Sequence, residues 1–129
     1  MQKYIYIGCG GFAGAIIRYS IKQIQIQNYY ERIPLDTLFI NISGAFLLAF
    51  ILTAASKAWK INANMQMGIT VGFLGAYTTF STFCKETVLL IQSGDYFAAF
   101  FYVIISVALG FGAACLGMKF AHKIKTAAS

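Results

Sequence analysis

One run of glycines, hydroxyl-bearing residues and phenylalanines constrains this chain most, because it lies inside a long apolar segment. Residues 72–83 read GFLGAYTTFSTF. Lipid cannot satisfy polar groups, so polar atoms at membrane depth must face protein or a water-filled path. If the apolar segment crosses a membrane, the run therefore predicts a polar path inside the protein rather than a lipid-facing surface.

The composition places the chain in the membrane class. Of its 129 residues, 59% are hydrophobic and only 11% are charged, whereas soluble domains are typically about 25% charged. The net charge of +6 comes from basic residues that lie mainly between or after apolar runs, as membrane-flanking residues do. These basic residues do not form a stripe along which phosphates would lie, so we expect a lipid bilayer and no nucleic acid as partner.

The reactive side chains do not form a catalytic or metal-binding pattern. Cys9, Cys84 and Cys115 lie in separate apolar segments without C-x-x-C spacing, so we expect them to fill space in helix packing. No nucleophile is paired with a base, and His122 lies in the basic tail, where we expect it to face solvent. The sequence therefore predicts that the protein is not an enzyme.

Four apolar segments are long enough for membrane-spanning helices of about 20 residues each. We expect a single four-helix membrane domain over residues 1–129, with approximate spans 4–21, 37–55, 65–91 and 96–120. The third segment is too long, since it would rise about 40 Å across a hydrocarbon core of about 30 Å. Glycines weaken it, and the β-branched Thr78 and Thr79 follow, so we expect a break near Gly75 and Thr78. Broken transporter helices hold cations with such freed carbonyls.

The first segment carries small residues at helical spacing, Gly10 with Gly14 and Gly11 with Ala15. Such residues let two helix backbones approach closely in lipid. The same stretch, GCGGFAG, approximates a dinucleotide-binding fingerprint, with Glu31 about 20 residues further on. That fingerprint needs a surrounding βαβ unit, whereas the next element is another apolar helix. We therefore interpret the small residues as helix-packing positions.

The basic residues are unevenly distributed around the four predicted spans. The side with both termini and the second loop carries Lys3, Lys57, Lys60, Lys119, Lys123 and Lys125. The other side carries Arg18, Lys22 and Arg32. This difference favours cytoplasmic termini. Four short helices enclose little volume, so we also expect the chain to assemble with further copies.

A group of polar and aromatic residues is suited to lining a path through the membrane. Phe80 and Phe83 lie three residues apart and share a helix face. The remaining members carry hydrogen-bond donors: Asn41, Ser81, Thr82, Tyr102 and Ser106. Donors suit an anion, and electropositive aromatic edges can contact an anion that has shed its water. Each type also has a structural interpretation, since phenylalanines pack, hydroxyls bond to their own helix and asparagine joins helices.

At these residues the chain resembles the Fluc (CrcB) family of bacterial fluoride channels. The likeness covers nearly the whole chain. It rests on GGFAGA with Arg18 and Tyr19, on PLDTL leading to Asn41, on Gly44, and on GAYTTFSTF followed by Glu86. The block GAYTTFSTF is highly specific, whereas the first block alone is a weak indication.

The resemblance implies an antiparallel homodimer, in which two identical chains are inserted in opposite orientations. It implies two fluoride paths, each built from both subunits. Within them, Phe80 and Phe83 match fluoride-contacting phenylalanines, and Asn41 matches a pore-lining asparagine. Tyr102 and Ser106 match the start of a polar track. The charge difference between the two membrane sides favours a single orientation, but we expect the dual insertion that the motifs imply.

The resemblance also implies one central sodium ion, structural rather than transported, held by the backbone carbonyls of Gly75 and Thr78. The chain departs from the family pattern at a few positions. Cys84 stands where a serine is common, and Lys85 adds a charge beside Glu86. The far part of the polar track lacks hydroxyls at Gly110 and Ala114.

These residues and the resemblance favour passive, fluoride-selective permeation. The resemblance implies that the channel lies in the cell inner membrane and exports fluoride that is trapped in the cytoplasm. One alternative is a small proton-coupled multidrug exporter, which needs a membrane-buried carboxylate. Glu86 is the only acid within a core crossing, and Lys85 lies beside it. A third hypothesis is a non-transporting assembly subunit whose small-residue faces are only adhesive.

Overall fold

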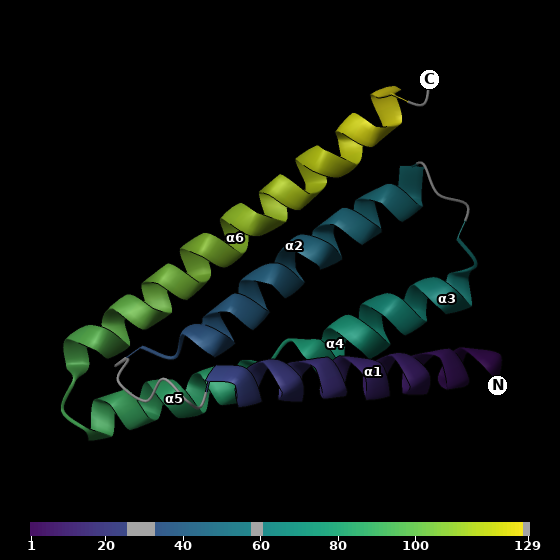
Figure 1. The fold of residues 1–129 in the computed structure, drawn as a ribbon. Helices are drawn as coiled ribbons and strands as arrows, with labels where there is room; N and C mark the ends of the chain where they lie inside the picture. The colour runs from purple at the N-terminus through teal and green to yellow at the C-terminus, as the bar shows by residue number, and fades with distance from the viewer. Residues whose placement is uncertain (26–32, 58–60, 128–129) are drawn as a thin grey trace.

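The computed structural model describes residues 1–25, 33–57 and 61–127, and within these ranges the chain is all-helical, as predicted. The helices form four passes (Figure 1). Three of them are the continuous helices α1 (Gln2–Gln25), α2 (Leu35–Lys57) and α6 (Tyr96–Ala127). The third pass consists of α3 (Ala63–Met67), the π-helix η1 (Gly68–Phe73), α4 (Leu74–Tyr77) and α5 (Phe80–Gln92).

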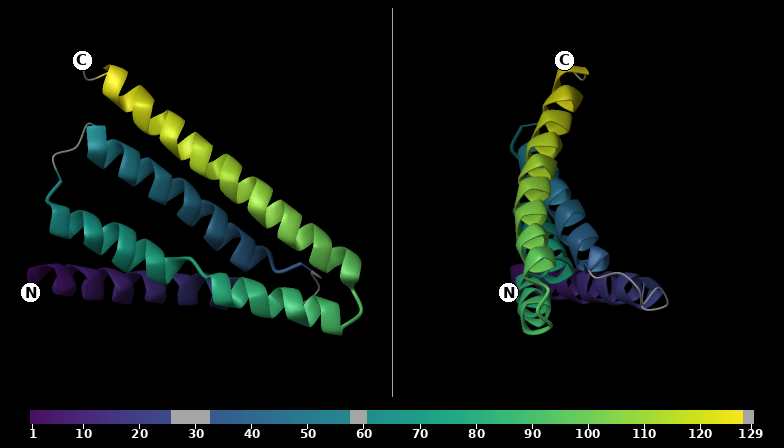
Figure 2. Two further views of the ribbon diagram at one scale, coloured as in Figure 1. Left: turned by 180° about the vertical axis from the view of Figure 1, so that it is seen from behind. Right: turned by 90° about the vertical axis from the view of Figure 1, so that its left-hand side faces the viewer.

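The passes lie in two pairs. Helix α2 runs beside α6 along most of its length, and α1 runs beside α3, η1 and α4 (Figures 1 and 2). Helix α5 carries the third pass to the end of the molecule where α1 finishes and α2 and α6 begin. Both chain termini lie toward the opposite end. Residues far apart in sequence therefore meet around α5.

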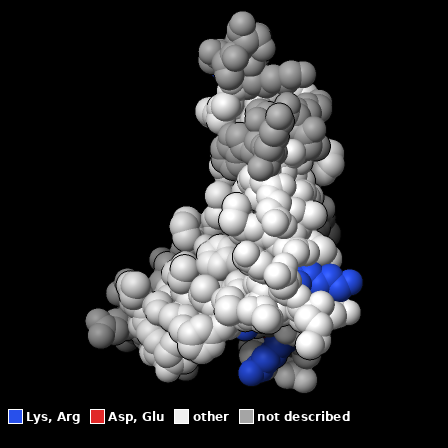
Figure 3. Space-filling model, turned by 90° about the vertical axis from the view of Figure 1, so that its right-hand side faces the viewer, with Lys and Arg blue, Asp and Glu red and all other residues white. Residues whose placement is uncertain are grey.

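Within the part of the chain that the structure describes, two helices are apolar and long enough to cross a membrane: Leu35–Ala55 and Tyr96–Ile124, each with a mean hydropathy of 2.2. Only 17% of either apolar window is buried, whereas the core helix of a soluble protein would be mostly covered. Figure 3 shows a face whose described surface is almost entirely uncharged, with basic side chains near its lower edge. These features indicate a membrane protein. Crossings by α1 and by the third pass stay predictions.

The orientation of the chain in a membrane also stays a prediction. Among the basic residues compared between the two sides, Lys60 of the termini side and Arg32 of the other side lie outside the described residues. The side chains of Lys57 and Lys125 lie outside them as well.

The third pass is not one continuous helix. Helix α4 ends at Tyr77, and Thr78 and Thr79 are extended, with ψ angles of 157° and 114°. Helix α5 begins at Phe80, where the Thr79 hydroxyl oxygen accepts a hydrogen bond of 3.2 Å from the amide of Thr82. This is an N-cap, which satisfies one of the amides that a helix start leaves unbonded. The cap lets α5 start again immediately after the extended residues.

A small apolar core lies on the N-terminal side of these extended residues. Its buried members are Ile40 of α2 with Leu74 and Tyr77 of α4. Partly buried side chains from α1, α2 and η1 pack against them: Ile21, Ile51 and Phe73. The core therefore joins α1, α2 and the first half of the third pass.

Helix α1 approaches η1 with almost no side-chain volume between the backbones. A Cβ atom added at Gly10 would overlap the carbonyl oxygen of Gly68, and one at Gly14 would overlap the carbonyl oxygen of Phe73. At Gly11, by contrast, the nearest atom would be 3.8 Å away. The small-residue packing predicted for the first segment is confirmed for Gly10 and Gly14.

Replacing Gly10 by alanine tests this close approach. We expect Gly10→Ala to lower the free energy of unfolding by about 1–3 kcal/mol, because the added methyl group forces the Gly68 backbone away. Gly11→Ala is the matched control and should not destabilise the protein, because its methyl group has room and alanine favours a helix. Thermal unfolding of the purified protein in detergent measures both variants. Equal losses in the two variants would contradict the close contact.

Candidate functional site

Asn41 of α2 holds the backbone of the third pass where its helix is interrupted. Its side-chain Nδ2 donates to the Thr79 carbonyl at 3.0 Å, and its Oδ1 accepts from the Thr79 amide at 2.8 Å. In a continuous α-helix that amide would bond to the carbonyl of Gly75 instead. One asparagine thus satisfies both backbone polar groups of one extended residue. Its role as a pore-lining side chain stays a prediction.

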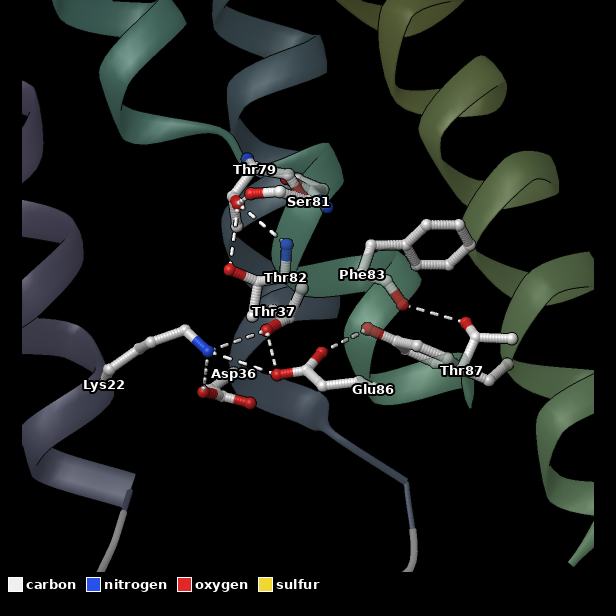
Figure 4. A network of polar contacts seen from close by, with 11 residues as sticks. Lys22, Asp36, Thr37, Thr79, Ser81, Thr82, Phe83, Glu86 and Thr87 are labelled. Carbon is white, nitrogen blue, oxygen red and sulfur yellow. Dashed lines mark hydrogen bonds and ion pairs between the residues drawn. The ribbon is translucent and has the colours of Figure 1, made fainter. Parts of the chain in front are cut away.

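Thr79 also gathers two of the predicted pathway hydroxyls. Its Oγ1 donates to Thr82 Oγ1 at 2.9 Å and lies 3.4 Å from Ser81 Oγ (Figure 4). Because Thr79 is the donor in the first of these bonds, the Thr82 hydroxyl keeps its own proton for another acceptor. The structure therefore brings Ser81 and Thr82 together through a neighbour that the sequence analysis did not assign to the path.

Phe83 lies between the other predicted aromatic residues. Its ring centroid is 6.1 Å from that of Phe80 and 5.1 Å from that of Tyr102. Phe80 is 78% exposed, whereas Tyr102 is completely buried. The three rings therefore form a row that leads from the surface of the chain to its interior. Their spacing is within the range of aromatic pairs that meet edge to face or with offset planes.

Ser106 uses its hydroxyl within its own helix. Its Oγ donates to the Tyr102 carbonyl of α6 at 2.6 Å. This is the back-bonding that serine commonly makes to a carbonyl four residues earlier. The polar track that starts at Tyr102 and Ser106 therefore stays a prediction. For Ser106 to take part, its hydroxyl would have to leave the Tyr102 carbonyl and donate to an ion.

A group of charged side chains surrounds Glu86, whose carboxylate contacts the hydroxyl of Tyr102. One carboxylate oxygen of Glu86, Oε2, accepts from the Tyr102 hydroxyl at 2.8 Å. The other, Oε1, accepts from the Thr37 hydroxyl at 2.9 Å and from Lys22 Nζ at 3.2 Å. Lys22 also pairs with Asp36 at 3.1 Å. Figure 4 shows Lys22 reaching from α1 toward both carboxylates.

The sequence analysis missed this arrangement. Lys85 is the neighbour of Glu86 in sequence, but its side chain is exposed, and Lys22 is the cation that contacts the carboxylate. The sequence did indicate that Glu86 has a partner, because an acid at membrane depth requires a compensating group. Lys22 and Glu86 are 64 residues apart, so no local spacing rule selects the pair.

A cavity of about 360 Å³ opens beside the interrupted pass. Its walls include Asn41, Gly75, Thr78, Thr79 and Phe80. A Cβ atom added at Gly75 would meet nothing within 4 Å. The two residues predicted to hold sodium therefore lie on an open face of the chain, together with the outermost ring of the aromatic row.

Comparison with known proteins assigns the chain to a family. Residues 5–118 match the family described as CrcB-like protein, Camphor Resistance (CrcB). The chain belongs to this family. The matched range includes most of each of the four passes and every predicted site residue from Asn41 to Ser106, so the family resemblance inferred from the motifs is confirmed.

Several relatives of this CrcB-like chain are named fluoride-specific ion channel FluC. The relative from Hydrogenobaculum sp. is 40% identical over 116 residues, covering 90% of this chain and 94% of the relative. The one from Thermosipho melanesiensis is 39% identical over 118 residues, covering 91% and 94%. The one from Acidobacterium capsulatum is 37% identical over 123 residues, covering 95% and 98%. Their names describe channels rather than enzymes.

The Asn41 contacts predict a large stability effect. We expect Asn41→Ala to lower the free energy of unfolding by at least about 2 kcal/mol, because it leaves the amide and carbonyl of Thr79 without their partner. Asn62→Ala is the control, since exposed Asn62 caps α3 by accepting one bond of 2.9 Å from Asn64, and losing such a cap costs about 1 kcal/mol. Thermal unfolding compares the two. A loss no greater at Asn41 than at Asn62 would exclude this structural role.

Proposed function

We propose that the protein is a fluoride-selective channel that lets fluoride leave the cytoplasm passively through the cell inner membrane. The observation that carries this proposal is the row of the Phe80, Phe83 and Tyr102 rings, in a chain whose relatives are named fluoride-specific channels. The rings supply edges, and the hydroxyls of Tyr102 and Thr82 supply donors. Both are groups that stabilise an anion without carrying a permanent charge.

The chemical task is to replace the water that fluoride loses. A small anion holds water strongly, so a path must offer donors at each position and must still release the ion. The Thr82 hydroxyl has a proton to donate, and Ser81 lies in the same hydroxyl cluster. The electropositive edges of Phe80 and Phe83 provide a weaker contact between these positions. Weak contacts in series favour passage over tight binding.

We further propose that two copies of the chain assemble in opposite orientations and form two paths. Phe80 is 78% exposed, and the cavity beside it is open. Polar backbone groups at membrane depth need cover from protein. A second copy would supply that cover and the missing wall of each path. Opposite insertion is the arrangement that the family resemblance implies.

The carbonyls of Gly75 and Thr78 fit a structural sodium ion. In a continuous helix they would accept from the amides of Thr79 and Thr82, but these amides donate to Asn41 Oδ1 and to Thr79 Oγ1. The Thr78 carbonyl receives only a long contact of 3.5 Å from Arg18 among the bonds that the structure describes. Hard cations prefer such oxygen ligands. Two copies would offer four carbonyls around one ion.

Fluoride efflux from liposomes tests the channel proposal. We expect Phe83→Ile and Phe80→Ile each to lower the initial efflux rate at least about tenfold, because isoleucine keeps apolar bulk but lacks the ring edge. Phe97→Ile is the matched control, since Phe97 on α6 is 74% exposed and lies outside the aromatic row. A fluoride electrode records the release. Wild-type rates in both variants would exclude direct ring contact, and no release from the wild-type protein would exclude the channel.

The sodium proposal has a separate test. We expect the purified assembly to melt at a higher temperature in sodium chloride than in N-methyl-D-glucamine chloride of equal ionic strength, because a bound ion stabilises the folded state. Potassium chloride is the control that separates a specific effect of sodium from an effect of any small monovalent cation. The same melting temperature in all three salts would remove sodium from the proposal without affecting the fluoride path.

The contacts of Glu86 give no support to a proton-coupled exporter. Such a transporter needs a carboxylate that exchanges protons for cations. Both oxygens of Glu86 already accept hydrogen bonds, from Tyr102 on one side and from Thr37 and Lys22 on the other. The relatives are also named as channels. We therefore propose a passive channel rather than an exporter or an enzyme.

A further inference from the structure

A charged network lies next to the aromatic row, although a path for anions has no evident use for carboxylates. We name it the Lys22 network, and its members are Lys22, Asp36, Thr37, Glu86 and Tyr102. We propose that Lys22 is a positioning residue for anion entry, which neutralises and orients Glu86 so that this carboxylate does not repel anions from Tyr102. The inference rests on the proposed fluoride permeation and concerns how that path tolerates an acid.

The ammonium group of Lys22 is fully used in this network. Its Nζ lies 3.2 Å from Glu86 Oε1, 3.1 Å from Asp36 Oδ2 and 3.0 Å from Thr37 Oγ1. Three acceptors match the three protons of an ammonium. The side chains of Lys22, Asp36 and Glu86 are only 28%, 20% and 16% exposed, so their charges interact more strongly than they would in bulk water.

The network carries more negative than positive charge. Two carboxylates, Asp36 and Glu86, face one ammonium. Arg18 lies one helical turn before Lys22, but its guanidinium is directed to the Thr78 carbonyl at 3.5 Å. Lys85 precedes Glu86 on α5, but its side chain is exposed. Among the residues that the structure describes, Lys22 is therefore the cation that offsets the charge of Glu86 next to the aromatic row.

Glu86 competes with any anion for the proton of Tyr102. The Tyr102 hydroxyl donates to Glu86 Oε2 at 2.8 Å, and its ring lies 5.1 Å from that of Phe83. An anion can use this hydroxyl only if it replaces the carboxylate as acceptor. By binding Oε1, Lys22 and Thr37 draw charge away from Oε2 and weaken it as an acceptor. Lys22 therefore assists the exchange as well as reducing repulsion.

The network also reaches an opening of the chain. Glu86 lines a second cavity, of about 330 Å³, together with Pro34, Leu89, Leu90 and Ser93. Figure 4 shows the charged groups at the ends of α1 and α2, below the hydroxyl cluster of Thr79. An ion that moves between this cavity and the aromatic row must pass the field of Glu86.

The experiment measures initial fluoride efflux from liposomes in charge-matched variants at low ionic strength. We expect Lys22→Met to lower the rate at least about fivefold, because it leaves two carboxylates unbalanced. Adding Asp36→Asn to Lys22→Met restores the wild-type sum of charges, and we expect a rate within about twofold of wild type. Asp36→Asn alone should equal or exceed the wild-type rate. Lys22→Arg keeps the charge and should retain most of the flux.

Salt separates an electrostatic role from a merely structural one. Raising the concentration of an impermeant salt shortens the Debye length from about 30 Å at 0.01 M to about 3 Å at 1 M. We therefore expect the deficit of Lys22→Met to shrink at high salt. Lys3→Met is the matched control, since Lys3 lies at the opposite end of α1 over the ring of Tyr4. It should change the rate by less than about twofold.

The outcomes are distinguishable. Restoration by Asp36→Asn together with loss of the deficit at high salt supports the proposal. If Lys22→Met conducts like wild type, or if its deficit persists in the double variant and at high salt, Lys22 has no electrostatic role in entry. If Lys22→Met does not fold, a reduced rate in Asp36→Asn alone overturns the proposal. Absence of flux in the wild-type protein would instead overturn the proposed function, and this inference with it.

Discussion

Two hydrogen bonds between the Asn41 side chain and the Thr79 backbone support the rest of this structure. In apolar surroundings a chain cannot leave helical geometry unless the freed amides and carbonyls find partners. Asn41 satisfies Thr79 on both sides, and the Thr79 hydroxyl caps the helix that follows. This lets α5 begin at Phe80 in a new register. The aromatic row, the hydroxyl cluster and the freed carbonyls of Gly75 and Thr78 all follow from this one interruption.

The carboxylate of Glu86, at the end of the molecule where α2 begins, also needs partners from distant parts of the chain. A carboxylate away from water needs compensation by charge and hydrogen bonds. Glu86, on α5, obtains it from the three other passes, through Lys22 of α1, Thr37 of α2 and Tyr102 of α6. The contacts hold the ends of these helices together. They also place an acid beside the aromatic row without leaving its charge unbalanced.

The sequence predicted much of the fold because lipid imposes simple requirements on a chain. Apolar length indicated the helical passes, and the Gly10 and Gly14 spacing indicated a close helix contact. For the site, local spacing grouped Phe80 with Phe83, and the structure places Phe83 beside Tyr102 as well. The sequence did not reveal that the hydroxyl of Ser106 bonds to a carbonyl of its own helix. A serine whose hydroxyl is free and one that bonds to its own helix have the same sequence pattern.

The amino-acid sequence was sufficient for the features that depend on neighbours along the chain: apolar lengths, small-residue spacing and the run of hydroxyl and aromatic residues. Only the tertiary structure decided which distant groups satisfy one another. It chose Lys22 rather than Lys85 as the partner of Glu86, and the Thr79 backbone as the partner of the Asn41 amide. The physical reason is that a buried charge or amide must be paired somewhere, and only helix packing determines which partner comes within reach.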